Sequence, residues 1–109
     1  MKIVIVGAGT VGTAICAQLI NENHDLTVVD KRQSVLTELS DVNDVAGVQG
    51  NGADISVLKK AGAARADLLI AVTSSDEINI LCCAAAVMMF AAFIRGLSER
   101  PESSLALAL

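Results

Sequence analysis

The stretch MKIVIVGAGTVG, residues 1–12, decides the fold of this chain. β-Branched residues occupy positions 3–6, as in a buried strand, and the pattern GAGTVG follows at once. In such a pattern Gly7 allows a tight turn, Gly9 leaves the backbone open to a pyrophosphate, and Gly12 lets the next helix pack close to the strand. We therefore expect a strand, a glycine turn and a helix whose first amides face the phosphates of a dinucleotide.

The acidic residue that completes this pattern is Asp30, which ends a second apolar run, Leu26–Val29. It follows Gly12 at close to the spacing of about 20 residues typical of the acid that binds a ribose. A carboxylate there accepts hydrogen bonds from both ribose hydroxyls and repels a 2′-phosphate, which favours NAD over NADP. Lys31 and Arg32 follow directly, and either would tolerate a 2′-phosphate or line the adenine side. The exact nucleotide therefore stays open.

The composition indicates one α/β domain with an aliphatic core. The chain has 109 residues, of which 53% are hydrophobic and only 2% aromatic. Such a core suits a parallel sheet that is buried on both faces. The formal net charge is −4 and no basic cluster is present, so we expect no nucleic acid partner.

The reactive residue types form no catalytic or metal site. Cys16, Cys82 and Cys83 lack the spacing of metal ligands and favour a reduced, cytosolic setting. His24, the single histidine, lies in a polar turn without an acid–base partner. We therefore expect neither catalytic residues nor a bound metal.

The uncharged run Ile80–Ile94 is the nearest thing to a membrane segment. Its 15 residues fall short of the roughly 17–25 that a spanning helix needs. The run is also rich in alanine, so we expect a buried helix instead. The apolar run before Gly7 is too short for a signal peptide.

The rest of the chain alternates between helices and strands. Predicted helices cover Thr10–Asn21, Gln33–Asp41 and the segment from Asp54 to Ala61, and further strands cover Val45–Gln49 and Leu68–Val72. The apolar residues expected to face the sheet from these helices are Val11, Ala14, Ile15, Leu19, Val35, Leu36, Leu39, Ile55 and Leu58. Ser74 and Glu77 have the spacing of a capping box, which predicts a fourth helix.

These elements fit an α/β fold: a Rossmann-like, doubly wound parallel sheet with three α/β/α layers and strand order 3-2-1-4(-5). In this order the loops that follow the strands meet at one edge of the sheet. The backbone around Asn51 and Gly52 would then meet the adenosine half of a ligand. Thr73 and Ser74 would face the pyrophosphate or the second ribose.

Four segments together resemble a known family: MKIVIVGAGTVG, DLTVVDK, VQGNGAD and ADLLIAVTSSDEIN. They are similar to the N-terminal RCK or KTN nucleotide-binding domain of the Trk system potassium uptake protein A family, from Met1 to about Leu81. The resemblance implies a cytoplasmic protein, peripheral to the inner face of the cell membrane, that binds NAD or NADH, or in relatives ATP or ADP. It also implies a membrane-embedded potassium channel or transporter subunit as partner, and assembly into dimers or rings.

The resemblance also implies ligand-binding roles residue by residue. The residues implied to hold the pyrophosphate are Gly7, Ala8, Gly9, Thr10 and Val11. The other implied contacts are Asp30 and Lys31 at the adenosine ribose, Asn51 and Gly52 near the adenosine, and Thr73 and Ser74 near the other half of the ligand.

The last quarter of the chain departs from the family pattern. The family's fourth helix mixes polar and apolar residues, whereas Cys82–Phe90 is almost without polar groups. A fifth strand then follows in the family, but Ala91–Leu97 fits a strand poorly, and Arg95 is a candidate for the family's arginine there. We therefore place the nucleotide-binding domain at residues 1–95 and an atypical, exposed tail at 96–109.

The leading functional hypothesis is a regulatory module that senses a nucleotide and gates a potassium uptake system, without being an enzyme. Nucleotide binding would act by favouring one assembly state over another. The alternative is the cofactor-binding half of a NAD-dependent oxidoreductase, and a third reading is a structural domain with a relict pocket. No Lys, His or Tyr stands where hydride transfer would need one, which favours the sensor.

Overall fold

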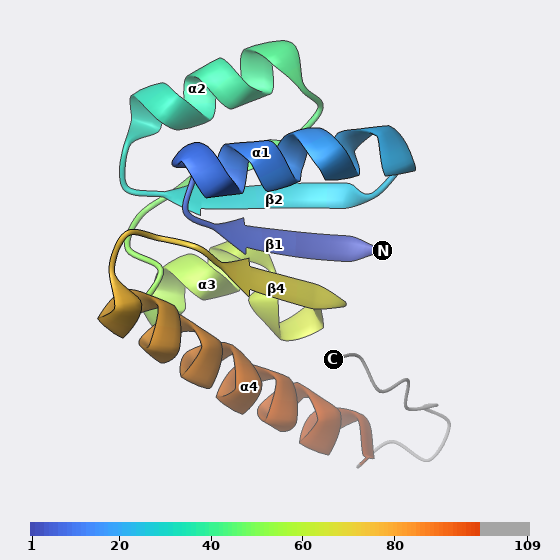
Figure 1. The fold of residues 1–109 in the computed structure, drawn as a ribbon. Coiled ribbons are helices and arrows are strands. Elements are labelled where there is room, and N and C mark those ends of the chain that lie inside the picture. The colour runs from blue at the N-terminus through green and yellow to red at the C-terminus, as the bar shows by residue number, and fades with distance from the viewer. Residues whose placement is uncertain (99–109) are drawn as a thin grey trace.

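Four parallel strands form one sheet, in the order β3-β2-β1-β4, in the computed structural model, which describes residues 1–98 (Figure 1). The strands are β1 (Lys2–Val6), β2 (Asp25–Asp30), β3 (Ala46–Gln49) and β4 (Leu68–Ala71). Val6 at the end of β1 pairs with Val29 on one side and with Ala71 on the other. The predicted Rossmann-like order is confirmed, and it brings the loops after these strands to one edge.

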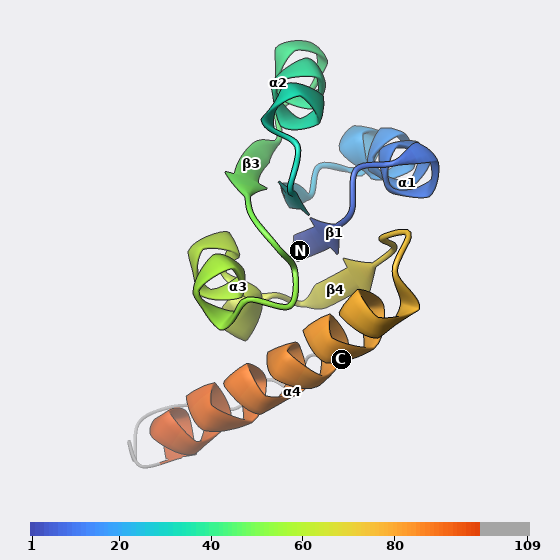
Figure 2. The same ribbon diagram turned by 90° about the vertical axis from the view of Figure 1, so that its left-hand side faces the viewer.

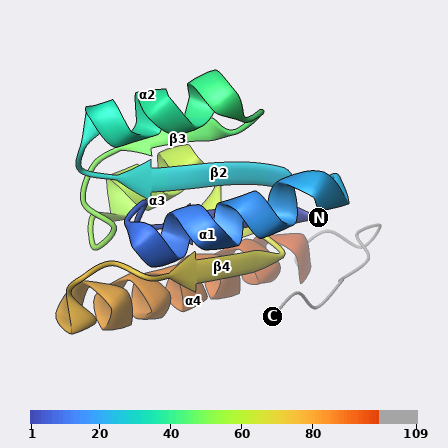
Figure 3. The same ribbon diagram turned by 45° about the horizontal axis from the view of Figure 1, so that its top comes forward.

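Helices cover both faces of the sheet and complete the three layers (Figure 2). α1 (Thr10–Leu19) and α2 (Gln33–Val42) pack on one face, and α3 (Ile55–Ala61) and α4 (Asp76–Ser98) on the other. Figure 3 shows α1 in front of the sheet, between β2 and β4. Short 3-10 helices at Ile20–Glu22 and Ala63–Arg65 lead into β2 and β4.

Alternate residues of β1 fill two separate cores. Ile5 clusters with Cys16 of α1 on one face, and Val4 clusters with Leu58 of α3 on the other. All four residues of the IVIV run are at most 1% exposed. The central position of β1 therefore explains why the run has no polar residue: both of its faces are covered.

The inner face of α1 is rotated relative to the prediction. Gly12 and Cys16 are buried, whereas Val11 is 57% exposed and Ala14 is exposed as well. Gly12 lies directly against the carbonyl of Gly7, so the side of the helix that has no side chain lies nearest the sheet. This contact fixes the rotation, and the prediction for Val11 and Ala14 is wrong.

The predicted inner faces of α2 and α3 are mostly confirmed. Leu36 and Leu39 of α2 are buried, and Asp54 caps α3 by accepting the Ser56 amide at 2.9 Å. Leu58 is fully buried, but Ile55, predicted to face the sheet, is half exposed. Ile55 is the first residue of α3, where the chain has not yet turned toward the sheet.

α4 differs most from the prediction of a buried helix. Cys82 is fully buried against the sheet, but Val87 is 68% and Met88 72% exposed. The segment Asp76–Gly96 is long and apolar enough to cross a membrane, with a mean hydropathy of 2.1, and 6% of its apolar window is buried. The prediction is wrong because α4 meets the sheet along one narrow side and leaves the rest uncovered.

The two ends of α4 also correct the sequence prediction. At its start, the Ile78 amide donates to Ser75 Oγ at 3.2 Å, so Ser75 and not Ser74 is the cap. At its other end, residues 91–97 are helical, and α4 crosses the expected domain boundary at 95 without a break. The Arg65 guanidinium lies 5.5 Å above the Phe93 ring and ties this part to the body. Of the predicted tail at 96–109, residues 99–109 lie outside the described part of the chain.

Candidate functional site

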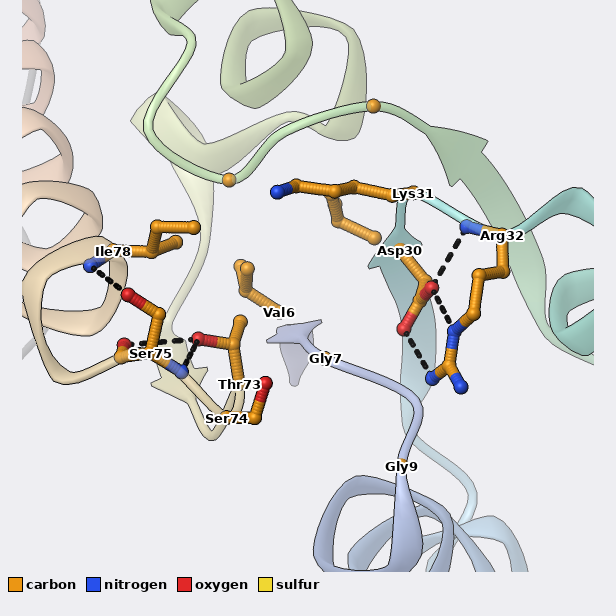
Figure 4. Close-up of a pocket in the computed structure, with 13 residues that line it drawn as sticks. Val6, Gly7, Gly9, Asp30, Lys31, Arg32, Thr73, Ser74, Ser75 and Ile78 are labelled. Atoms are coloured by element: carbon orange, nitrogen blue, oxygen red, sulfur yellow. Dashed lines mark hydrogen bonds and ion pairs between the residues drawn. The ribbon is translucent and has the colours of Figure 1, made fainter.

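A pocket of about 380 Å³ opens at the carboxyl edge of the sheet (Figure 4). Its walls come from the turn after β1, the end of β2, the loop after β3 and the segment between β4 and α4. The residues that line it are Val6, Gly7, Gly9, Val29, Asp30, Lys31, Arg32, Gly50, Gly52, Thr73, Ser74, Ser75 and Ile78. This is the crevice in which doubly wound sheets bind their ligands.

The glycine turn has the geometry that the sequence pattern predicted. Gly7 has a φ of +107°, which side chains disfavour, and its amide donates to the Val29 carbonyl at 2.8 Å. A Cβ on Gly12 would lie 1.8 Å from the Gly7 oxygen, whereas a Cβ on Gly9 would meet no atom within 4 Å. The turn is therefore closed toward the helix at Gly12 and open toward the pocket at Gly9.

The first turn of α1 begins beside this opening. Gly9 is the N-cap, with no side chain to cap the helix, and the first helical hydrogen bond runs from the Thr13 amide to the Gly9 carbonyl at 2.9 Å. The amides of residues 10–12 precede that bond and have no partner within the helix. Together with the helix dipole they make this end suited to an anion.

Asp30 stands at the end of β2 with its carboxylate held by neighbours. Oδ2 accepts the Ala8 amide at 2.8 Å, and Oδ1 accepts the Arg32 amide at 2.8 Å. The Arg32 guanidinium adds bonds from Nε at 3.0 Å and from Nη2 at 3.2 Å. Burial alone would raise the pKa of Asp30, but the Arg32 side chain, the two amides and the Arg32 charge outweigh it and lower the pKa to about 2. Asp30 is therefore an anion at any physiological pH.

The side chains of the two basic residues after Asp30 point in different directions. Figure 4 shows Arg32 folded back onto Asp30, whereas Lys31 extends across the pocket. With the Asp30 charge paired to Arg32, Lys31 supplies the remaining positive charge of this wall. Such a balance favours a ligand that carries phosphate groups.

The opposite wall is a network of hydroxyl and amide groups. The Asn79 side-chain oxygen accepts from the Thr73 amide at 2.9 Å and from Thr73 Oγ1 at 2.6 Å. Asn79 Nδ2 donates back to the Thr73 carbonyl at 3.2 Å. This network fixes the loop between β4 and α4, and it leaves Ser74 exposed at the pocket.

Not all of the predicted ligand-binding residues line the pocket. Those that do are Gly7, Gly9, Asp30, Lys31, Gly52, Thr73 and Ser74. Those that do not are Ala8, Thr10, Val11, Gly12 and Asn51. Ala8 gives its amide to Asp30, and the Asn51 side-chain oxygen accepts the Ala53 amide at 2.9 Å within its own loop.

Sequence reasoning missed several lining residues. Gly50 adjoins the predicted Asn51–Gly52 pair. Ser75 caps α4 and Ile78 lies in its first turn, so a correct position for that cap indicates both. The site predicted from the sequence does not include Arg32, although it lines the pocket. Its position near Asp30, the acid that ends β2, is the feature of the sequence that indicates a place for Arg32 in the pocket.

The other reactive groups lie away from the pocket. His24 contacts the N-terminal amine and Glu22, each at 3.2 Å, beside the first residue of β2 and so at the opposite edge of the sheet. Burial raises the pKa of the Cys16 thiol, and burial with the charge of Cys83 raises that of Cys82 to about 11. Within residues 1–98, no three His, Cys, Asp or Glu side chains gather as a metal site would require.

Comparison with known proteins identifies the family. Residues 3–102 match the model of the TrkA-N domain. The chain belongs to the TrkA-N domain family. This TrkA-N domain is 46% identical over 90 residues to the Trk system potassium uptake protein TrkA of Haemophilus influenzae, covering 83% of this chain and 20% of that protein. It is 40% identical over 102 residues to the TrkA homolog of Archaeoglobus fulgidus, covering 94% and 23%.

The resemblance seen in the sequence is therefore confirmed, and the chain spans about a fifth of the length of these relatives. Two solved structures share the fold of this TrkA-N domain. The Kef CTD of Shewanella denitrificans in AMP-bound form has a TM-score of 0.71 at 20% identity and covers 84% of this chain and 54% of its own. Apo saccharopine dehydrogenase from Saccharomyces cerevisiae has a TM-score of 0.69 at 17% identity, covering 82% and 20%. At such identities these structures show the Rossmann-like fold alone.

Proposed function

We propose that this TrkA-N domain binds an adenine nucleotide, with NAD or NADH as the leading candidates and ATP or ADP as alternatives. The observation that carries the proposal is the pocket itself, where the open turn at Gly9 and the carboxylate of Asp30 line one cavity. The free amides at the start of α1 suit a pyrophosphate, and Asp30 suits a ribose. Thr73 and Ser74 lie on the far wall, at the place for the other half of a dinucleotide.

The role of this binding is regulatory in our proposal. The relatives are Trk system potassium uptake proteins, so the partner is a membrane-embedded potassium channel or transporter subunit, with this domain on its cytoplasmic side. A nucleotide that binds one state of the assembly better than another shifts the transport equilibrium toward that state. The oxidised and reduced nicotinamides differ in charge, which gives the site a basis for distinguishing them.

We also propose that the domain acts as a homo-oligomer. The exposed apolar residues of α4, which include Val87 and Met88, form the kind of surface that assembly would bury. Sedimentation equilibrium tests this: the parent should form dimers or larger species, and Met88→Glu should shift it toward monomer. A monomeric parent at high micromolar concentration would contradict this part of the proposal.

Ligand-dependent unfolding tests the proposed function. The chain is unfolded in the presence of NAD, NADH, ATP, ADP or AMP, with inorganic phosphate as the control for anion binding alone. A true ligand at 100 times its dissociation constant should raise the free energy of unfolding by about 2.7 kcal/mol. No shift with any nucleotide, or an equal shift with phosphate, would contradict the proposal.

The alternative function is the cofactor-binding half of an oxidoreductase. The pocket lining contains Lys31 but no His or Tyr, and Lys31 lies on the proposed adenosine side. Incubation with NADH and a panel of carbonyl compounds distinguishes the two classes. Turnover above the background rate would favour the enzyme over the sensor.

A further inference from the structure

The Asp30 carboxylate, which the proposed function assigns to a ribose, is already fully occupied. Oδ1 accepts the Arg32 amide and the Arg32 Nε at 2.8 and 3.0 Å. Oδ2 accepts the Ala8 amide and the Arg32 Nη2 at 2.8 and 3.2 Å. An ionised carboxylate offers about four acceptor sites, and here four donors use them. A ribose diol can therefore reach Asp30 only when one of these donors leaves.

The four donors differ in how easily they leave. The amides of Ala8 and Arg32 are held by the glycine turn and by the chain at the end of β2. The guanidinium, in contrast, sits on a side chain that is 58% exposed, whereas the Asp30 side chain is 8% exposed. Water can take the place of an exposed guanidinium, so displacing this partner costs less than displacing either amide. The Arg32 side chain is thus the donor that a ligand displaces.

We propose that Arg32 sets the nucleotide preference of this site, an inference that rests on the proposed function. A ligand with a free 2′,3′-diol must displace the guanidinium before its hydroxyls reach Asp30, which weakens its binding. A ligand with a 2′-phosphate needs no free acceptor on Asp30, and the guanidinium offers it a planar pair of donors. Asp30 alone would favour ligands with a free 2′,3′-diol over ligands with a 2′-phosphate. Arg32 therefore makes this difference in affinity smaller.

Lys31 provides a matched comparison, because it carries the same charge and lines the same pocket. Its side chain extends across the cavity in Figure 4, and it takes no part in the four bonds to Asp30. Removing Lys31 takes away one positive charge without freeing an acceptor. It should therefore weaken every phosphate-bearing ligand alike and leave their ratio unchanged.

Calorimetric titration of the whole chain with ADP-ribose and with 2′-phospho-ADP-ribose tests the proposal. For Arg32→Ala we expect the affinity for ADP-ribose to rise about threefold and that for the 2′-phosphorylated ligand to fall about threefold. Lys31→Ala should lower both affinities. Arg32→Lys keeps the charge but loses the planar pair of guanidinium donors. It should also bind ADP-ribose more tightly than the parent does, and it replaces Arg32→Ala in the test if that variant fails to fold.

The outcomes separate the two claims. If the parent binds ADP-ribose but the ratio of the two affinities is the same in the parent and in folded Arg32 variants, the role of Arg32 is overturned and the proposed function stands. If both affinities move in the same direction, as expected for Lys31→Ala, Arg32 contributes charge only and the inference is also overturned. If the parent binds neither ligand at millimolar concentration, the proposed function and this inference fail together.

Discussion

The two walls of the pocket achieve their shape by different means. On the β1–β2 wall the backbone makes the shape: Gly7 adopts a positive φ, and Gly12 lies directly against it. On the β4–α4 wall side chains make the shape, because Asn79 holds Thr73 through three hydrogen bonds. Asp30 belongs to the first wall but ties it to the side chain of Arg32.

The difference indicates how each wall tolerates change. A wall made by close backbone contact has no room for a single added carbon, because nothing beside it can move aside. A wall made by side chains loses hydrogen bonds when a residue is replaced, but water can enter and restore part of them. Substitutions at the close backbone contacts of the β1–β2 wall should therefore cost more stability than substitutions on the β4–α4 wall.

The largest loss is expected for Gly12→Ala. The new Cβ would overlap the Gly7 carbonyl, so α1 must move away from β1, and we expect the free energy of unfolding to fall by about 3 kcal/mol. Chemical denaturation measures this loss. Gly9→Ala is the matched control in the same turn, because its Cβ meets open space. Equal stability of the two variants would remove the contrast between the closed and open sides of the turn.

An intermediate loss is expected for Asp30→Asn. Because the pKa of Asp30 is lowered to about 2 in the folded state, from an ordinary value of 3.8, its charge contributes about 2 kcal/mol of stability at neutral pH. That contribution is complete above about pH 5 and is lost progressively as the pH falls toward 2. Unfolding followed from pH 7 to pH 2 should show Asp30→Asn less stable at pH 7 and closer to the parent at pH 2. Parallel curves across this range would contradict the assignment.

The smallest loss is expected for Asn79→Ala, on the wall that side chains build. It removes the side-chain oxygen that accepts hydrogen bonds from the Thr73 amide and from Thr73 Oγ1. We expect about 1 kcal/mol less stability, because water reaches this part-buried site. Asn21→Ala, at an exposed residue, is the control and should change little. Should Asn79→Ala destabilise the chain more than Gly12→Ala does, the comparison of the two walls would be reversed.

The parts of this molecule that were predictable from sequence are those set by local pattern. Residues 3–6 and the glycines that follow predicted β1, the turn and the start of α1, because each position has a steric reason for its residue type. The acid at the end of β2 was predicted in the same way. The strand order followed from the pattern of a doubly wound sheet and is confirmed.

The parts that were not predictable depend on partners far away in the chain. The apolar run in α4 indicates a buried helix. How much of the helix is covered depends on how far the sheet reaches beneath it, and Val87 lies on the side that the sheet does not cover. Ser74 and Ser75 have the same capping chemistry, and the loop held by Asn79 decides between them. Arg32 follows Asp30 in the sequence, but its fold back onto the carboxylate depends on the extended backbone before α2.

Whether a nucleotide lies over the glycine turn is tested by calorimetric titration of the parent and of Gly9→Val with NADH. A valine at position 9 points into open space, so the fold should survive, as circular dichroism and chemical denaturation can verify. Its side chain then fills the place where a pyrophosphate would approach the turn, so we expect saturable binding by the parent and none by Gly9→Val. Equal affinity of the two proteins would contradict this expectation, because the ligand would then not lie over the glycine turn.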